Sequence, residues 1–183
     1  MEILSTPLKD CWLIKNTIFP DERGYFFESF NHKKFSALTG WEGTFVQDNQ
    51  SSSSYGVVRG LHFQMGEYAQ AKLVRVLQGK VLDVAIDLRP DSPTFGKSFA
   101  VELTESNEFQ LFVPRGFAHG FSVLSEQATF FYKCDNYYHK AAENGIHPLD
   151  ADLNVDWQIG ADQAKLSGKD QAAQSFKQYL ASL

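Results

Sequence analysis

Apolar and polar residues alternate most regularly in the segment KVLDVAIDL, residues 80–88. Leu82, Val84 and Ile86 share one face of this segment, and Asp83 lies on the other. A period of two is the pattern of a β-strand, because successive side chains of a strand point to opposite faces of the sheet. The segment therefore predicts a strand with one apolar face.

Shorter runs rich in aromatic and β-branched residues predict further strands. These runs lie at residues 25–30, 43–48, 72–77, 110–113, 121–124 and 129–133. Turn residues separate them, and the tract SSSS at 51–54 predicts a polar loop. Two helices are expected at the periphery. One starts at Asn31, an acceptable N-cap, and stops at Gly40, and the other covers residues 170–183.

Composition supports a mainly β chain. The sequence has 16 Phe and 7 Tyr, gathered in short runs between Gly, Pro, Asn and Ser, which is typical of a β sandwich or barrel. The length of 183 residues, without repeats or linkers, predicts that residues 1–183 form one domain.

Charge and cysteine content exclude several classes of function. The formal net charge of -5 gives no overall attraction to nucleic acid or to acidic membranes. Apolar runs are too short to span a bilayer, and the N-terminus lacks the apolar core of a signal peptide. Cys11 and Cys134 form no C-x-x-C pair, so we expect two reduced thiols in a cytoplasmic protein.

Two motifs carry candidate chemistry. RGLHFQ, residues 59–64, and PRGFAHGF, residues 114–121, match the two halves of a cupin-type barrel pocket. In a metal-binding cupin, a second His and a carboxylate stand where this chain has Gln64 and Lys72. An amide is a poor ligand for transition metals and a cation repels them, so we expect no metal and no other cofactor. The fold predicted is a cupin-type double-stranded β-helix, or jelly-roll barrel, with short peripheral helices.

Side chains that could bind an anion or a sugar flank these motifs. Arg23 and Arg59 each stand beside a glycine, where backbone can approach a ligand closely, although singly each could be a surface arginine. Gln47 and Asn49 share a strand face and offer amide donors and acceptors, although an ordinary solvated face is an equal alternative.

Four titratable side chains are expected to meet in the barrel lumen: His62, Lys72, His119 and Tyr132. Histidine titrates near neutral pH and so suits proton abstraction. A lone histidine such as His62 is more often a structural core residue than a catalyst, and a tyrosine such as Tyr132 is usually a core aromatic residue with a satisfied hydroxyl group. Their expected proximity favours acid–base chemistry.

Collinear segments over nearly the whole chain resemble one family. FPDERGYFFESF, FVQDNQSSSSYGVVRGLHFQ, KLVRVLQGKVLDVAIDLR, SPTFG, VPRGFAHGFSVL, FYKCDNYY and LSGKDQAA are closely similar to the dTDP-4-dehydrorhamnose 3,5-epimerase family. The resemblance implies an isomerase of dTDP-L-rhamnose synthesis that acts on a dTDP-linked 4-keto-6-deoxyhexose. It also implies a homodimer in which the partner covers an edge strand.

The resemblance implies a role for each matching residue. His62 matches the base that removes a proton next to the C4 ketone, and Asp170 matches the carboxylate that orients it. Tyr132 matches the acid that returns a proton, and Lys72 matches the cation near the C4 oxygen, where negative charge develops. Arg23, Arg59 and His119 match contacts to substrate and pyrophosphate. The residues that match the lining of the nucleotide-sugar site are Glu28, Gln47, Asn49, Tyr138, Glu143 and Lys169.

Other functions remain open at this point. Epimerases that invert only C3 or only C5, and ketoisomerases of related deoxysugars, share this scaffold. A non-catalytic cupin that binds a nucleotide sugar is a second alternative. Tyr132 together with the pair of His62 and Asp170 favours inversion at both carbons.

Overall fold

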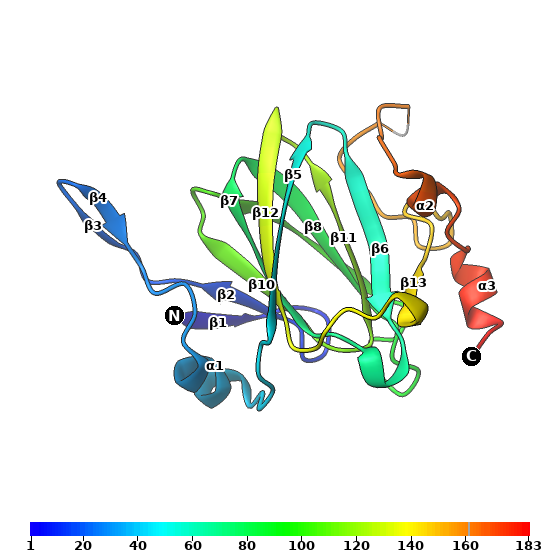
Figure 1. Ribbon diagram of the computed structural model, residues 1–183, viewed down its shortest axis with the longest axis horizontal. Coiled ribbons are helices and arrows are strands. Elements are labelled where there is room, and N and C mark those ends of the chain that lie inside the picture. Colours follow the sequence, from blue (N-terminus) through cyan, green and yellow to red (C-terminus); the bar gives the residue numbers. More distant parts are fainter. Residues whose placement is uncertain (161) are drawn as a thin grey trace.

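The computed structural model describes residues 1–160 and 162–183. Over these residues, antiparallel strands form a six-stranded sheet, a five-stranded sheet and a separate hairpin (Figure 1). The six-stranded sheet has the order β1 (Glu2–Ser5), β2 (Trp12–Lys15), β10 (Phe109–Val113), β7 (Lys72–Gln78), β12 (Gln127–Cys134), β5 (Gln47–Ser54). The five-stranded sheet has the order β13 (Glu143–Gly145), β6 (Val58–Gln64), β11 (Phe117–Val123), β8 (Lys80–Asp87), β9 (Ser98–Thr104).

The two large sheets pack face to face around an apolar lumen. Val74 of β7 and Phe130 of β12 come from one sheet, and Ala85 of β8 and Phe121 of β11 come from the other. Alternate side chains of each strand point into this space, so inward apolar residues bury themselves against the facing sheet. The mainly β, cupin-type jelly roll expected from the sequence is confirmed.

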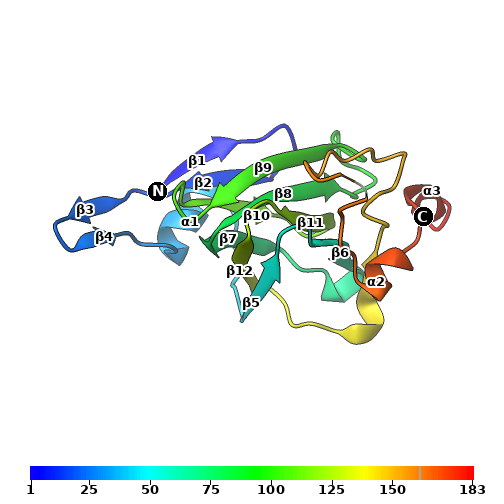
Figure 2. The same ribbon diagram turned by 90° about the horizontal axis from the view of Figure 1, so that it is seen from above.

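Peripheral segments cover the outer faces of both sheets. Helix α1 (His32–Thr39) buries Phe35 against Phe112 of the six-stranded sheet. The C-terminal third covers the five-stranded sheet with an apolar cluster that includes Trp157 and Tyr179. Short helices are α2 (Gly168–Gln171) and α3 (Phe176–Leu180), with 3-10 turns η1 (Gly66–Tyr68) and η2 (Lys140–Ala142) (Figures 1 and 2).

The first predicted helix is confirmed at both ends. The Asn31 side chain accepts a hydrogen bond from the backbone N–H of Lys34. Gly40 ends the helix with φ of 72°, in the left-handed region that a glycine adopts without strain.

The second predicted helix is interrupted and ends early, so that expectation was wrong over residues 172–175 and 181–183. The carbonyl of Gln174 accepts a hydrogen bond from the N–H of His147, which holds the chain extended at that point. Ser175 then starts α3 as an N-cap in a capping box with Gln178.

Two strand predictions and the loop prediction also need correction. Strand β4 (Gly24–Phe26) ends at Phe26, and Phe30 packs instead against Phe35 and Phe45. Strand β5 begins at Gln47 and runs through the serine tract, because residues 51–54 pair with β12. Backbone pairing thus determines the structure of residues whose side chains predict a loop.

A hairpin of β3 (Phe19–Asp21) and β4 projects from the body on the side away from β6 in both views (Figures 1 and 2). Its apolar side chains are largely exposed, including Phe19, Tyr25 and Phe26.

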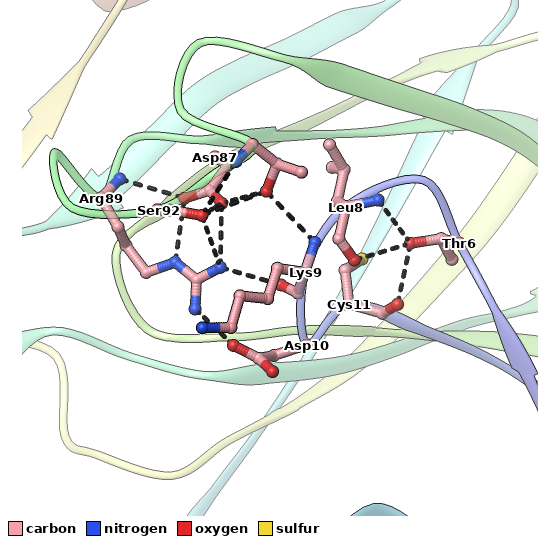
Figure 3. Close-up of polar contacts among 9 residues, drawn as sticks. Thr6, Leu8, Lys9, Asp10, Cys11, Asp87, Arg89 and Ser92 are labelled. Atoms are coloured by element: carbon pink, nitrogen blue, oxygen red, sulfur yellow. Dashed lines mark hydrogen bonds and ion pairs between the residues drawn. The ribbon is translucent and has the colours of Figure 1, made fainter.

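A polar network ties the β1–β2 connection to the turn after β8 (Figure 3). The Arg89 guanidinium donates to both carboxylate oxygens of Asp87, to Asp10 and to the carbonyl of Lys9. Burial acts to raise the pKa of Asp87, but hydrogen bonds from Arg89, Ser92 and Thr94 outweigh it and hold the pKa at about 2. Asp87 therefore acts as an ionised bridge between two loops.

Within the described ranges, no helix is sufficiently long and apolar to cross a membrane.

Candidate active site

The four titratable residues predicted to share the lumen line one cavity of about 240 Å³. His62 comes from β6, Lys72 from β7, His119 from β11 and Tyr132 from β12. His62, Lys72 and Tyr132 also line an adjoining compartment of about 90 Å³ that reaches Tyr138 and Glu143. Both sheets thus contribute polar groups to the same end of an otherwise apolar lumen.

His62 and Asp170 form a close pair. His62 Nε2 lies 2.5 Å from Asp170 Oδ1, and the Ser167 hydroxyl donates to Asp170 Oδ2 at 2.8 Å. Burial alone would raise the pKa of Asp170, but hydrogen bonds from His62 and Ser167 bring it below its ordinary value. The ionised carboxylate accepts from Nε2, which leaves Nδ1 of His62 free to accept a proton.

Helix α2 holds Asp170 in this position. Ser167 is the N-cap of the helix, and its hydroxyl oxygen accepts a hydrogen bond from the backbone N–H of Asp170. The same hydroxyl donates to the Asp170 carboxylate, so the cap fixes both the main chain and the side chain. Asp170 is 3% exposed.

Lys72 and Tyr132 are two further titratable residues that line the lumen cavity. Lys72 Nζ lies 5.9 Å from the centre of the Tyr132 ring and makes no hydrogen bond with any described residue. Burial lowers the pKa of Lys72, an effect that Cys134, Asp83 and Glu143 oppose. Burial raises the pKa of Tyr132, so its hydroxyl is protonated at neutral pH and able to donate.

Amide side chains of β5 face the same cleft. Gln47 Nε2 donates to Asn49 Oδ1 at 3.0 Å, and Gln47 Oε1 accepts from the backbone N–H of Tyr138. The intervening Asp48 points outward and pairs with Lys133 at 2.9 Å, as strand parity predicts. Arg59 donates to Ser53 of β5 at 3.0 Å.

Tyr138 and Glu143, which line the smaller compartment, form a chain of polar contacts with Lys169. The Tyr138 hydroxyl donates to Glu143 at 2.9 Å, and Lys169 forms an ion pair with the other oxygen of Glu143. Burial acts to raise the pKa of Glu143, but its contacts with Lys169 and Tyr138 leave that pKa lower than usual.

Gln64 binds backbone groups at the position where a metal-binding cupin has a metal-ligating histidine. Its amide accepts from the backbone N–H of His139 at 2.7 Å and donates to the carbonyl of Tyr68. These bonds fix the segment that carries Tyr138. Over residues 1–160 and 162–183, no group of three His, Cys, Asp or Glu side chains is placed to hold a metal ion.

Comparison with known proteins agrees with this geometry. Residues 5–178 match the family model described as dTDP-4-dehydrorhamnose 3,5-epimerase. The chain belongs to this family. It is 48% identical to the dTDP-4-dehydrorhamnose 3,5-epimerase of Shigella flexneri over 176 residues, which are 96% of each chain.

Solved structures of the epimerase family superpose closely on this chain. The dTDP-4-dehydrorhamnose 3,5-epimerase of Elizabethkingia anophelis NUHP1 is 58% identical with a TM-score of 0.95, over 97% of both chains. The epimerase of Legionella pneumophila Philadelphia 1, in complex with dTDP-4-keto-L-rhamnose, is 48% identical with a TM-score of 0.92, over 96% of this chain and 93% of the other.

Two of the residues matched to the epimerase family lie away from the cavity within one chain. Arg23 lies in the turn of the projecting hairpin, where its side chain is 84% exposed and pairs with Asp21 at 2.6 Å. Glu28 follows the hairpin and pairs with Lys34 of α1 at 2.8 Å. Neither residue is among those that line the cavities around His62 of the same chain.

Asp83 is a lumen residue that the sequence pattern missed. It lies on β8, is fully buried, and its Oδ1 is 2.9 Å from His119 Nε2. Its parity with Ala85 and Asp87 predicts a polar outer face, whereas both faces of β8 are buried. The lumen covers one face of β8 and the C-terminal segment covers the other, which alternation along the strand itself cannot show.

A larger hollow of about 610 Å³ lies between α1 and the turn after β10. Its charged side chains are already paired, Arg89 with Asp10 and Arg115 with Asp135. The lumen cavity, by contrast, contains the side chain of Lys72, which has no ion-pair partner among residues 1–160 and 162–183. The lumen cavity, although smaller than this hollow, is therefore the better candidate for chemistry on a charged intermediate.

Proposed function

We propose that this chain converts dTDP-4-dehydro-6-deoxy-D-glucose to dTDP-4-dehydro-L-rhamnose, by inversion at C3 and C5, in dTDP-L-rhamnose biosynthesis. The hydrogen-bonded pair of His62 and Asp170, beside Lys72 in one cavity, carries the proposal. The similarity to epimerases, one of them solved with dTDP-4-keto-L-rhamnose, supports the choice of substrate.

His62 is the base in this reaction. The C4 ketone acidifies the hydrogens on C3 and C5, so a neutral imidazole held against the sugar can remove one of them. The Asp170 carboxylate fixes the tautomer of the ring and stabilises the imidazolium that forms. An enolate results, with negative charge on the C4 oxygen.

Lys72 and Tyr132 act on that enolate. The ammonium group of Lys72 stabilises the charge on the C4 oxygen, and a cation in a desolvated site is most effective there. Tyr132 returns a proton to the face opposite His62, which inverts the carbon. Its raised pKa keeps the proton available at neutral pH.

The remaining lumen residues bind the substrate. Arg59 and His119 contact the sugar and its pyrophosphate, since guanidinium matches phosphate oxygens in a bidentate geometry. The residues assigned to the nucleotide-sugar cleft are Gln47, Asn49, Tyr138, Glu143 and Lys169.

Arg23 and Glu28 reach a substrate only if the chain forms a homodimer. We assign the projecting hairpin to the site of a second copy, where the Arg23 guanidinium contacts the pyrophosphate. The exposed apolar side chains of the hairpin, such as Phe19 and Phe26, favour burial against a partner. The chain is assigned to the cytoplasm, where it acts as one domain on a soluble nucleotide sugar.

Deuterium incorporation from solvent tests substrate, reaction and regiochemistry together. The enzyme is incubated with dTDP-4-keto-6-deoxyglucose in D₂O, and the product is analysed by NMR. Label at both C3 and C5 is expected. Label at a single carbon would indicate a narrower epimerase, isomerisation of the ketone would indicate a ketoisomerase, and no label would indicate a binding protein.

A further inference from the structure

Two histidine–aspartate pairs lie side by side in the lumen. His62 and His119 are direct partners in the register between β6 and β11. Each uses Nε2 to meet a carboxylate, His62 that of Asp170 at 2.5 Å and His119 that of Asp83 at 2.9 Å. The first pair explains the proposed base. The second pair is the more deeply buried, and its carboxylate, Asp83, has no part in that scheme.

Asp83 occupies an unusual place for a carboxylate. Its neighbours of the same parity on β8 are Val81 and Ala85, which belong to the apolar lumen core. Asp83 is 0% exposed, and its Oδ2 has no hydrogen-bond partner among the described residues. Burying a carboxylate is costly unless nearby groups compensate its charge, so this position favours a task beyond packing.

Titratable side chains face Asp83 from both sheets. His119 of β11 is hydrogen-bonded to it, and Lys72 of β7, in the facing sheet, lies within electrostatic range. Cys11, between β1 and β2, is another titratable neighbour, but burial raises the pKa of its thiol to about 12, so it is neutral. Asp83 therefore contacts one residue of the proposed site, His119, and lies near a second, Lys72.

The hydrogen bond also determines which nitrogen of His119 is available. An ionised carboxylate only accepts, so Nε2 of His119 must carry a hydrogen. The nitrogen left for a ligand is then Nδ1, on a ring whose side chain lines the cavity. A free histidine would sample both tautomers and both orientations.

We propose that Asp83 is a positioning residue, which holds the His119 imidazole in the tautomer with hydrogen on Nε2 and so presents Nδ1 to the sugar nucleotide. The proposal rests on the proposed function for its kinetic consequence, but the tautomer itself does not depend on any substrate.

Imidazole ¹⁵N NMR tests the tautomer directly. Long-range ¹H–¹⁵N spectra of the full-length enzyme are recorded at neutral pH, and His119 is assigned by the signal lost in His119→Gln. Wild type is expected to show a hydrogen on Nε2 of His119. A hydrogen fixed on Nδ1, or rapid exchange between the two nitrogens, would overturn the proposal even if no Asp83 variant folded.

Asp83→Asn then separates positioning from packing. The asparagine has nearly the same volume but can donate through its amide, so His119 should lose its single tautomer. We expect kcat/KM to fall about 10–100-fold, the effect known for groups that orient metal-ligating histidines, with the loss mainly in KM because His119 is proposed to contact the substrate. An unchanged tautomer together with an unchanged kcat/KM would contradict the role.

Asp87→Asn is the matched control, because Asp87 is a buried aspartate on the same strand that pairs with Arg89 outside the cavity. The Asp87→Asn variant should have lower thermal stability and an unchanged His119 spectrum and kcat/KM.

The deuterium assay and the tautomer measurement fail independently. If wild type incorporates no deuterium, the proposed function is wrong, whereas the tautomer measurement still decides the assignment of Asp83.

Discussion

At the scale of single residues, His62 offers the sharpest test of the chemistry. His62→Ala removes the base, so the rate of epimerisation should fall by at least ~10²–10⁴, the usual contribution of a general base. Affinity for dTDP, measured by calorimetry, should be nearly unchanged because the base is not needed for nucleotide binding. If a folded variant exchanged substrate hydrogens at the wild-type rate, another group would be the base.

Tyr132→Phe should separate exchange from inversion. The variant keeps the ring that packs beside Phe130 and loses only the hydroxyl group. His62 should still remove hydrogen, so deuterium continues to enter the substrate, while inverted product fails to accumulate, above all at C5. NMR of the product in D₂O measures both. A packing defect would lower exchange and inversion together, and wild-type inversion would remove Tyr132 from the mechanism.

Which residues face the lumen was largely predictable from strand parity. Gln47 and Asn49 face inward and Asp48 faces outward, as alternation requires. Asp83 could not be found in this way, because alternation shows which residues share a face but not whether that face is covered. Asp170 could be linked to His62 only by family resemblance, since 108 residues separate them.

At the scale of elements, the polar network around Asp87 should make the stability of the fold depend on pH in the acid range (Figure 3). The pKa of Asp87 is lowered from 3.8 to about 2 in the folded protein. Its stabilising contribution is therefore present above pH 3.8 and is lost as the pH falls through about 2. The difference in urea midpoint between wild type and Asp87→Asn should shrink over this range.

Asp91→Asn is the control for that series, because Asp91 lies exposed in the same turn. Its midpoint should follow that of wild type at every pH. A constant difference between wild type and Asp87→Asn down to pH 2 would mean that Asp87 stabilises the turn by shape and not by charge.

Element boundaries followed from sequence only where local chemistry determines them. Helix α1 has its own N-cap and a terminal glycine, so both ends were predictable. Strand β5 extends through the serine tract because β12 supplies partners for its backbone, which is a tertiary effect. The break between α2 and α3 has the same origin, since His147 bonds to Gln174.

At the scale of the whole molecule, the chemistry should need no metal. Gln64 binds backbone groups and Lys72 brings a positive charge to the place where a cupin metal would sit. Activity should survive dialysis against EDTA without loss. Loss on chelation, with recovery on adding zinc, iron or manganese, would show that the lumen residues bind a metal after all.

The proposed assignment of the projecting hairpin to the site of a second copy predicts that the smallest active unit is two chains, and complementation between two variants tests this. A chain with Arg23→Ala lacks the arginine of the hairpin, and a chain with His62→Ala lacks the base. The homodimer of either variant is therefore inactive. When the two chains are refolded together, each mixed dimer contains one site with both residues intact. About one quarter of all sites should then regain activity. Specific activity should also fall on dilution, because separated chains leave every pocket without its arginine.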